Sequence, residues 1–211
     1  GATPLERLTF AGRNRSPIWA PDSRRIAYQS DRQGDRAIFV QPVDGARSPE
    51  RLTTPALGES HAPEAWSPDG RTVLFSITTS SGVSLATLSM ANHRVTAFSD
   101  LQSAIPPNAR FSPDGRWVAY ARSDRGMPST IYVEPFPSTG AKYQLAVQGS
   151  PGTAHKPVWS HDGRELLYVP RLGGFEAVRV TTRPTFAFGN AVAIDRKFNP
   201  GAPAARALYD I

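Results

Sequence analysis

The sequence predicts an all-β protein, a β-propeller of four-stranded antiparallel blades, with four complete blades and a partial blade at the two ends. One motif recurs four times without gaps, and its anchor aromatics Trp19, Trp66, Phe111 and Trp159 are spaced by 47, 45 and 48 residues. A period of about 40 to 50 residues is typical of propeller blades. No segment keeps apolar residues three and four apart over the length of a helix. Four-stranded units of one kind cannot bury both faces alone, so we expect them to stack around a common axis.

Each repeat begins with a predicted β-hairpin. A short first strand ends at the anchor aromatic, a Pro-Asp-Gly type turn follows, and an apolar second strand begins seven residues after the anchor. The four copies of this hairpin motif are residues 16–28, 63–75, 108–120 and 156–168. The second strands are predicted at residues 26–28, 73–75, 118–120 and 166–168.

Two further strands complete each predicted blade. The third strands are expected at residues 37–40, 83–86, 130–133 and 177–180. The fourth strands are expected at residues 51–53, 94–98, 143–147 and 191–194. We therefore predict a single domain over residues 1–211, with blades at about 14–54, 61–98, 106–147 and 154–195.

The turn between the first two strands has a chemical explanation. Proline presets φ, aspartate accepts hydrogen bonds from nearby backbone amides, and glycine adopts positive φ without strain. We therefore interpret Asp22, Asp69, Asp114 and Asp162 as turn caps and not as a ring of metal ligands. Ser23 replaces the turn glycine and His161 replaces the proline. Neither change is expected to break its turn, but Ser23 is expected to give a different turn type.

The two ends of the sequence predict a partial blade. Residues 4–10 repeat the Glu-Arg-Leu-Thr pattern of residues 50–53, and residues 205–211 lie where a fifth anchor would fall. We therefore expect the chain to be a piece of a longer propeller. Its end strands then either complete one small blade or pair between copies in a homo-oligomer.

Composition excludes several classes of function. The net charge is +6 and the pI is about 10.1, but the 21 arginines are spread along the chain, so we predict no nucleic-acid patch. The absence of cysteine excludes disulfides, thiolate catalysis and cysteine-ligated metal. No run approaches the roughly 18 apolar residues of a membrane helix, so we predict no membrane insertion. The sequence has no Gly-x-Ser-x-Gly nucleophile motif, and we predict no catalytic residues and no cofactor.

Polar residues just before each anchor are the candidate binding site. They enter the innermost strand, where a propeller's central funnel opens, and they vary from repeat to repeat. The candidate ligand-binding residues are Asn14, Arg15, His61, Glu64, Asn108, Arg110, His155 and Lys156. His61 and His155 lack the spacing of a metal site, and no metal is predicted.

Two other features allow alternative interpretations. An arginine follows each anchor by five residues, and these are either solvated turn residues or a positive collar for an anionic group. The four are Arg24, Arg71, Arg116 and Arg164. Trp117 has no aromatic counterpart in the other repeats, and it is either a packed rim residue or an exposed contact residue.

The repeated proline, anchor aromatic, Ser-Pro-Asp-Gly and Ile-Ala-Tyr type strand resembles the TolB-like, WD-type β-propeller repeat of bacteria. Residues 7–10, 29–32, 111–115, 134–140 and 184–189 are most similar to the C-terminal sensor propellers of some bacterial membrane-anchored serine/threonine protein kinases. The resemblance implies a six- or seven-bladed ring outside the cytoplasmic membrane, periplasmic or extracellular, that recognises proteins, peptides or saccharides.

The resemblance leaves three functions open. The first is a non-catalytic sensor or interaction module of a larger bacterial protein. The second is the propeller gate of a serine peptidase of the prolyl oligopeptidase type, and the third is a periplasmic TolB-like envelope protein. A kinase domain and a membrane span upstream in the full reading frame would favour the sensor, and a hydrolase domain downstream would favour the gate.

Overall fold

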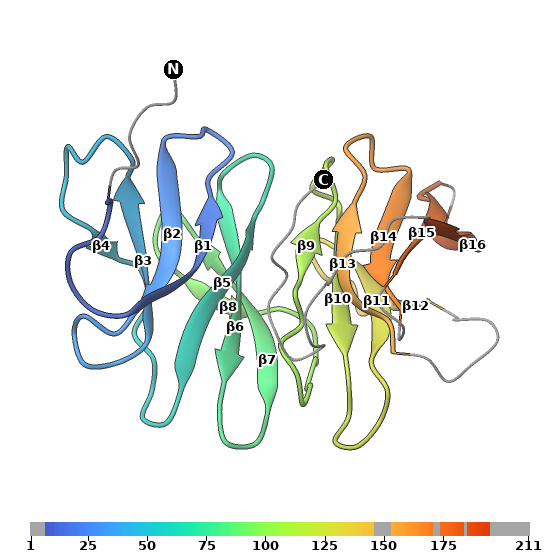
Figure 1. Ribbon diagram of the computed structural model, residues 1–211, viewed down its shortest axis with the longest axis horizontal. Coiled ribbons are helices and arrows are strands. Elements are labelled where there is room, and N and C mark those ends of the chain that lie inside the picture. The colour runs from blue at the N-terminus through green and yellow to red at the C-terminus, as the bar shows by residue number, and fades with distance from the viewer. Residues whose placement is uncertain (1–6, 146–152, 171–173, 184, 195–211) are drawn as a thin grey trace.

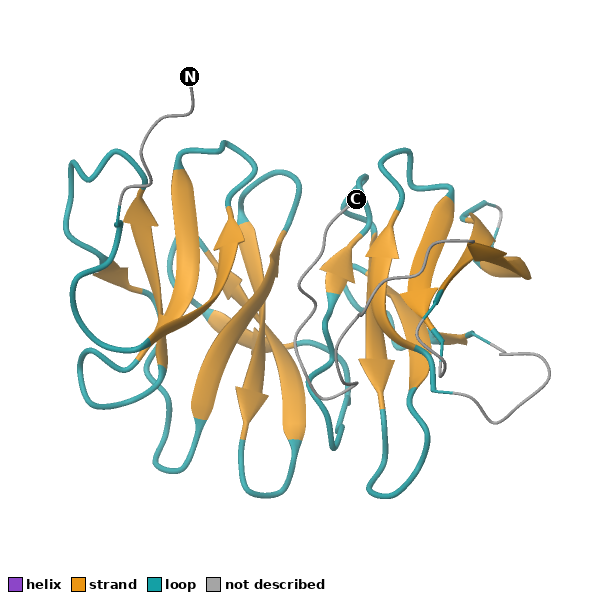
Figure 2. Ribbon diagram, in the orientation of Figure 1, coloured by secondary structure: helices purple, strands orange, loops and turns teal. Residues whose placement is uncertain are grey.

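The computed structural model describes residues 7–145, 153–170, 174–183 and 185–194. These residues form sixteen strands and no helix (Figure 2). The strands make four antiparallel four-stranded sheets, and each sheet contains four consecutive strands in chain order. The all-β prediction is therefore confirmed.

The sixteen strands are assigned to sheets A to D along the chain. Sheet A contains β1 (Asn14–Trp19), β2 (Arg25–Ser30), β3 (Ala37–Pro42) and β4 (Glu50–Arg51). Sheet B contains β5 (Ser60–Trp66), β6 (Thr72–Thr78), β7 (Val83–Ser89) and β8 (Val95–Ala97). Sheet C contains β9 (Arg110–Phe111), β10 (Trp117–Arg122), β11 (Thr130–Pro135) and β12 (Tyr143–Gln144). Sheet D contains β13 (His155–Trp159), β14 (Glu165–Val169), β15 (Phe175–Thr181) and β16 (Ala187–Ile194).

The four sheets follow one another as the blades of a propeller do. Figure 1 shows them in chain order from sheet A on the left to sheet D on the right. The first strand of each sheet contacts the first strand of the next, from β1 through β5 and β9 to β13. Successive inner strands are therefore neighbours in space.

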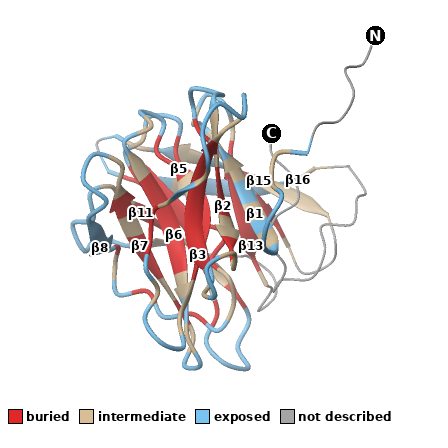
Figure 3. Cartoon of the chain, turned by 90° about the vertical axis from the view of Figure 1, so that its left-hand side faces the viewer, coloured by how far each residue is buried: buried red, intermediate tan, exposed pale blue. Residues whose placement is uncertain are grey.

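The hydrophobic core lies between successive sheets. Trp66 lies in one cluster with residues of sheets A and B, Phe111 in one with residues of sheets B and C, and Trp159 in one with residues of sheets C and D. Each of these anchors therefore packs between its own sheet and the preceding one. Figure 3 shows the buried residues concentrated in strands such as β2, β3 and β6, and the exposed residues in the end loops. Trp117 is packed between sheets C and D, 4.8 Å from the ring of Phe186, so its interpretation as a packed residue is confirmed.

The turn after each anchor repeats one hydrogen-bond network. In sheet C, the Ser112 hydroxyl donates to Asp114 at 2.6 Å and accepts the Trp117 backbone N–H at 3.0 Å. The Arg116 backbone N–H donates to the same carboxylate at 3.1 Å. Sheets B and D repeat these bonds through Ser67 with Asp69 and Ser160 with Asp162. The turn aspartates are therefore caps, as predicted.

Sheet A contains a variant of this network because Ala20 replaces the serine. Asp22 still accepts the Arg24 backbone N–H at 2.9 Å, and it also pairs with the Arg25 guanidinium at 2.9 Å. Ser23 has a φ of 55°, close to the 70° of Gly70 at the same turn position in sheet B. The prediction of a different turn type at Ser23 is therefore wrong in this respect, because the serine adopts the left-handed conformation of the glycine it replaces.

The predicted strands differ from the observed ones mainly at the outer edge of each sheet. The second and third strands all contain the predicted ranges, whereas β4 and β8 are shorter than predicted and β16 begins four residues earlier. Residues 7–10 form no strand, although residues 4–10 were expected to form one. The remainder of that prediction, residues 205–211 and the end of the strand predicted at 143–147 lie outside the described residues.

Candidate functional site

The ends of the four inner strands surround one hollow of about 540 Å³, called here the central hollow. Each sheet contributes the residues around its anchor aromatic, so the wall repeats the same part of the motif four times. The lining residues are Pro17, Ile18, Trp19 and Pro21 from sheet A, Glu64, Ala65, Trp66 and Pro68 from sheet B, Arg110, Phe111, Ser112 and Pro113 from sheet C, and Val158, Trp159, Ser160 and His161 from sheet D. Concave sites of this size, lined mainly by apolar groups with few polar ones, are typical of ligand sites.

Arg110 connects three inner strands at the wall of the central hollow. Its Nη1 donates to the backbone carbonyl of Glu64 in sheet B at 2.7 Å and to that of Ala109 at 3.0 Å. The indole Nε1 of Trp159 in sheet D donates to the carbonyl of Arg110 at 3.3 Å. The guanidinium is therefore fixed by backbone groups of two sheets, which is the kind of preorganisation that a binding group needs.

Most of the residues that line the hollow are apolar, although polar and apolar atoms contribute about equally to its exposed surface. Pro21, Pro68 and Pro113 come from the turns after the anchors of sheets A, B and C, and Pro17 lies in β1 before its anchor. Trp19 is 59 % exposed. The hydroxyls of Ser112 and Ser160 donate to the aspartates of their own turns. These two serines are therefore occupied in turn capping. The site can accept an extended or apolar group and hold it by a guanidinium.

Only Glu64 and Arg110 of the eight predicted site residues line the central hollow. His61, Asn108, His155 and Lys156 are each 4 % exposed or less and are not among the residues that line the hollow, whereas Glu64, which is 2 % exposed, is. Asn14 donates its side-chain amide to the carbonyl of Ala11 at 3.1 Å, and Arg15 is exposed at the start of β1. The structure thus brings two of the eight residues together at the hollow and places the other six elsewhere along the inner strands.

A β-bulge in three of the four inner strands affects which side chains face the hollow. The pairing register shifts between Arg15 and Ile18 in β1 and between His155 and Val158 in β13. A similar shift lies between Pro63 and Ala65 in β5. Each bulge adds one unpaired residue and redirects the side chains beyond it. Strict alternation along the strand therefore does not identify which side chains face the hollow.

The two histidines lie at the other end of the inner strands. The backbone N–H of His61 donates to the carbonyl of Arg36 in sheet A, and that of Ala154, next to His155, donates to Ser129 in sheet C, both at 2.9 Å. Burial, together with the neighbouring charge of Lys156, lowers the pKa of His155 to about 4. Burial also lowers the pKa of His61, although the carboxylate of Glu59 at 3.4 Å opposes that shift. Burial lowers the pKa of the Lys156 ammonium as well. Within the described residues, no three acidic or histidine side chains are grouped as metal ligands.

The four collar arginines are all exposed. Each donates its backbone N–H to the aspartate of its own turn, and the guanidinium of Arg164 lies 3.8 Å from Asp162. These contacts fit solvated turn residues. The anion collar stays a prediction.

Comparison with known proteins identifies the family. A family model described as the TolB beta propeller domain matches residues 16–186. The chain belongs to the TolB β-propeller domain family. This match includes strands of all four sheets, from within β1 to β15, and ends just before β16.

The relatives of this TolB-family propeller are longer proteins. The Bacillus subtilis protein named uncharacterized peptidase YuxL is 26% identical over 162 residues, which are 57% of this chain and 24% of that protein. The crystal structure of TolB from Acinetobacter baumannii matches with a TM-score of 0.65 and 25% identity, covering 90% of this chain and 47% of that one. A puromycin-hydrolyzing peptidase from Mycobacterium tuberculosis matches with a TM-score of 0.63 and 16% identity, covering 89% of this chain and 29% of that one. The chain therefore spans about a quarter of the curated relative and about half of the TolB structure.

Sequence reasoning missed most of the wall of this TolB-family hollow. It placed the anchor aromatics at the ends of the first strands and the prolines in turns, and it did not place either group at a binding site. The sequence feature that could have identified the wall is the repeat, because residues at one position of the motif in successive repeats meet around the axis of a propeller. Trp19 and its three counterparts all reach the hollow for that reason.

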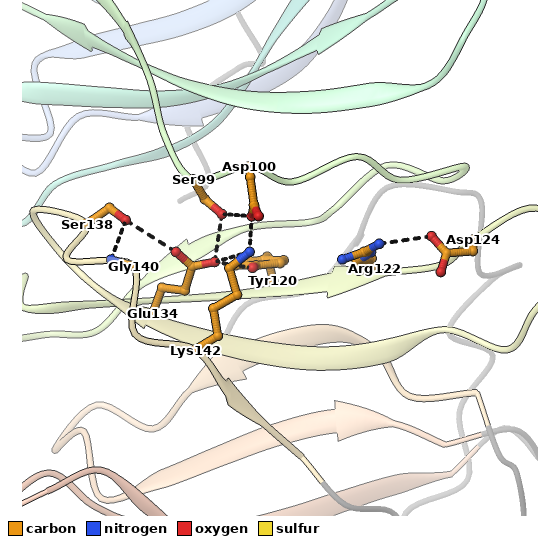
Figure 4. A network of polar contacts seen from close by, with 9 residues as sticks. All are labelled: Ser99, Asp100, Tyr120, Arg122, Asp124, Glu134, Ser138, Gly140 and Lys142. Atoms are coloured by element: carbon orange, nitrogen blue, oxygen red, sulfur yellow. Dashed lines mark hydrogen bonds and ion pairs between the residues drawn. The ribbon is translucent and has the colours of Figure 1, made fainter.

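A second polar cluster lies between sheets B and C, away from the hollow (Figure 4). Its centre is Glu134, which is fully buried and accepts hydrogen bonds from Tyr120 and, at 2.7 Å, from Ser99. Lys142 bonds to Asp100 and lies 3.7 Å from Glu134. Burial and the neighbouring carboxylate raise the pKa of the Tyr120 hydroxyl, so it remains a donor. This cluster joins the loop after β8 to sheet C, and we interpret it as structural.

No helix among the described residues is long and apolar enough to cross a membrane.

Proposed function

We propose that this chain is a non-catalytic binding propeller that recognises a peptide or a protein segment at the central hollow. The observation that carries the proposal is the wall itself, in which four inner strands present prolines, aromatic rings and a fixed guanidinium around one concave site. Apolar walls with a few fixed polar groups favour a ligand that has an apolar side chain beside a polar backbone. A saccharide is the alternative ligand class.

Arg110 is the polar group that we assign to ligand recognition. Its Nη1 is held by two backbone carbonyls, whereas its Nε and Nη2 have no hydrogen-bond partner among the described residues. Guanidinium donors bind carbonyl and carboxylate oxygens in a fixed plane. A backbone carbonyl or a carboxylate of the ligand is therefore the group expected to contact Arg110.

The biological setting is also part of the proposal. We place the chain in a larger bacterial protein, outside the cytoplasmic membrane, as a sensor or interaction module like the propellers of membrane-anchored protein kinases. Support comes from the motifs at residues 111–115 and 134–140, and from the short span of the chain relative to its relatives. A periplasmic TolB-like envelope protein is the related alternative.

The binding proposal is tested with a library of short peptides and intrinsic tryptophan fluorescence. Trp19, Trp66 and Trp159 line the hollow, so a ligand there changes their emission. Peptides that bind should lose at least about tenfold in affinity with Arg110→Ala, because a charge-assisted hydrogen bond is worth roughly 1.5 to 3 kcal/mol. Arg122→Ala is the matched control, since Arg122 pairs with Asp124 on the outer surface of sheet C. An equal loss of peptide affinity in both variants, or an unchanged affinity in both, would contradict the proposal.

A second candidate function is the propeller domain of a peptidase. The relationship to the Bacillus subtilis protein named as a peptidase favours it. In that case the full-length protein hydrolyses peptides, and the propeller restricts which substrates reach the catalytic domain. Peptidase assays on the full-length protein distinguish the two functions. If the propeller belongs to a peptidase, its removal should broaden the size range of the substrates that are cleaved. If it is a binding module alone, the full-length protein should show no peptidase activity.

A further inference from the structure

Arg110 is the charged exception at its position of the repeated motif. The residue just before the anchor is Ile18 in sheet A, Ala65 in sheet B, Arg110 in sheet C and Val158 in sheet D. All four of these residues line the central hollow. One cation therefore stands among apolar side chains at the same position of the wall. A ligand that complements this arrangement has one anionic group directly beside an apolar one.

The guanidinium of Arg110 forms no ion pair with any residue that the structure describes. Its Nη1 donates to the backbone carbonyls of Glu64 and Ala109, which are neutral acceptors, and the side chain is only partly exposed. The remaining donors, Nε–H and one N–H of Nη2, point in parallel from one edge of the guanidinium. This edge matches the two oxygens of a carboxylate, which also supplies the missing negative charge.

Several hydrogen-bond acceptors of the wall are occupied by the protein itself. The carbonyl of Glu64 accepts from Arg110, and the carbonyl of Arg110 accepts from the indole of Trp159 at 3.3 Å. The hydroxyls of Ser112 and Ser160 each donate to the aspartate of their own turn and accept a backbone N–H. The carboxylate oxygens of Glu64 are buried. An internal peptide segment brings N–H donors that need acceptors, whereas a carboxylate only accepts hydrogen bonds.

We propose that the central hollow binds the C-terminal carboxylate of a peptide whose last side chain is apolar. The proposal rests on the proposed function and names the part of the peptide that binds. The carboxylate contacts Nε and Nη2 of Arg110, and the last side chain lies against the apolar residues at the same motif position, such as Ala65 or Val158. An internal aspartate or glutamate also carries a carboxylate, but the backbone continues on both sides of it and brings more N–H groups to the wall.

The test uses N-acetylated tetrapeptides that end in Leu, Phe or Pro, each made as a free acid and as a C-terminal amide, and amides with an internal Glu. Isothermal titration calorimetry measures their affinities for the whole chain. We expect each acid to bind at least about tenfold more tightly than its amide, as a charge-assisted hydrogen bond provides. Arg110→Ala should remove this preference for the acid, and Arg110→Lys should keep part of it. Arg122→Ala is the matched control and should keep all of it, since Arg122 pairs with Asp124.

The comparison of acid with amide in the parent chain needs no variant, so it decides the question even if Arg110→Ala folds poorly. Equal binding of acids and amides would overturn this proposal and leave the peptide site in place. Tighter binding of the amides with an internal Glu than of the acids would also overturn it, and would assign the carboxylate to a side chain. If other library peptides bind and none of these acids does, the C-terminal proposal alone is wrong. If no peptide of either set binds, the proposed function is wrong as well.

Discussion

Ser23 illustrates how a single residue can keep a conformation that its side chain disfavours. Its φ of 55° lies in the left-handed region, which residues other than glycine seldom adopt. The other three sheets have glycine at this position, with φ of 69° or 70°. The turn is maintained in sheet A because Asp22 accepts the Arg24 backbone N–H and pairs with Arg25.

We predict that Ser23→Gly raises the free energy of unfolding by about 0.5 to 1 kcal/mol, because it removes the strain of a side chain at positive φ. Urea unfolding measures the change. Gly70→Ser is the reciprocal control and should lower stability by about 1 kcal/mol. A Cβ at Gly70 would meet Pro21 only at 4.0 Å, so the effect reports backbone strain and not a clash. Equal stability of Ser23→Gly and the parent would disprove this account of the turn.

His155 gives a prediction for pH dependence. Its pKa is about 4 in the folded chain, below the ordinary value of 6.5, and both ring nitrogens lack a partner among the described residues. The unfolded chain therefore binds more protons between these two values. The contribution of neutral His155 to the free energy of unfolding is fully present above about pH 6.5. It is lost as the pH falls toward 4, and it changes no further below that.

Urea unfolding at several pH values tests this prediction. Stability should fall from pH 6.5 toward pH 4, with a slope of up to about 1.4 kcal/mol per pH unit from this group. His155→Gln should reduce the slope. Asp69 does not confuse the result, because the hydrogen bond from Ser67 lowers its pKa below 3.8, so its contribution is lost at lower pH. An unchanged slope in His155→Gln would rule out His155 as the source.

At the level of whole strands and sheets, the anchor aromatics stabilise the contact between one sheet and the next. Trp66 is almost fully buried in the cluster between sheets A and B, and Trp19 occupies the same motif position but is 59 % exposed. The two residues form a natural pair for measuring what the interface contributes, since they occupy the same position of the repeated hairpin and differ strongly in exposure.

We predict that Trp66→Ala lowers the free energy of unfolding by about 3 to 5 kcal/mol, as removal of a buried tryptophan does. Trp19→Ala should change it by less than about 1 kcal/mol, because most of its ring is exposed. Both are measured by urea unfolding at a protein concentration where the chain is monomeric. Similar losses in the two variants would mean that the anchors stabilise their own hairpins and not the interface between sheets.

The sequence predicts the interior of each sheet better than its edges. The second strands of sheets B and C are apolar on both faces because they lie between two neighbouring sheets, and that pattern is visible in residues 73–75 and 118–120. The fourth strands are short or exposed, and the three residues of β8 are all exposed, so no apolar pattern marks their limits. Bulges in the inner strands also cannot be predicted from the sequence, because they depend on how the inner strand pairs with the second strand.

At the scale of the whole molecule, the repeat predicts the site better than residue chemistry does. A motif that recurs every 45 to 48 residues places Trp19, Trp66, Phe111 and Trp159 around one hollow. Selecting variable polar residues identified Glu64 and Arg110 but also included His61 and His155, which are buried at the other end of their strands. Burial of these side chains depends on how the sheets pack, and no local sequence pattern records it.

The central claim is that successive sheets pack radially, each on the one before, and NMR nuclear Overhauser effects across the three boundaries test it most directly. We predict contacts between Arg25 and the ring of Trp66, between Arg110 and Glu64, and between the indole N–H of Trp159 and the backbone of Arg110. All three should be present in one sample. Strong contacts within each sheet without these three, or contacts joining sheet A directly to sheet C, would contradict the propeller arrangement.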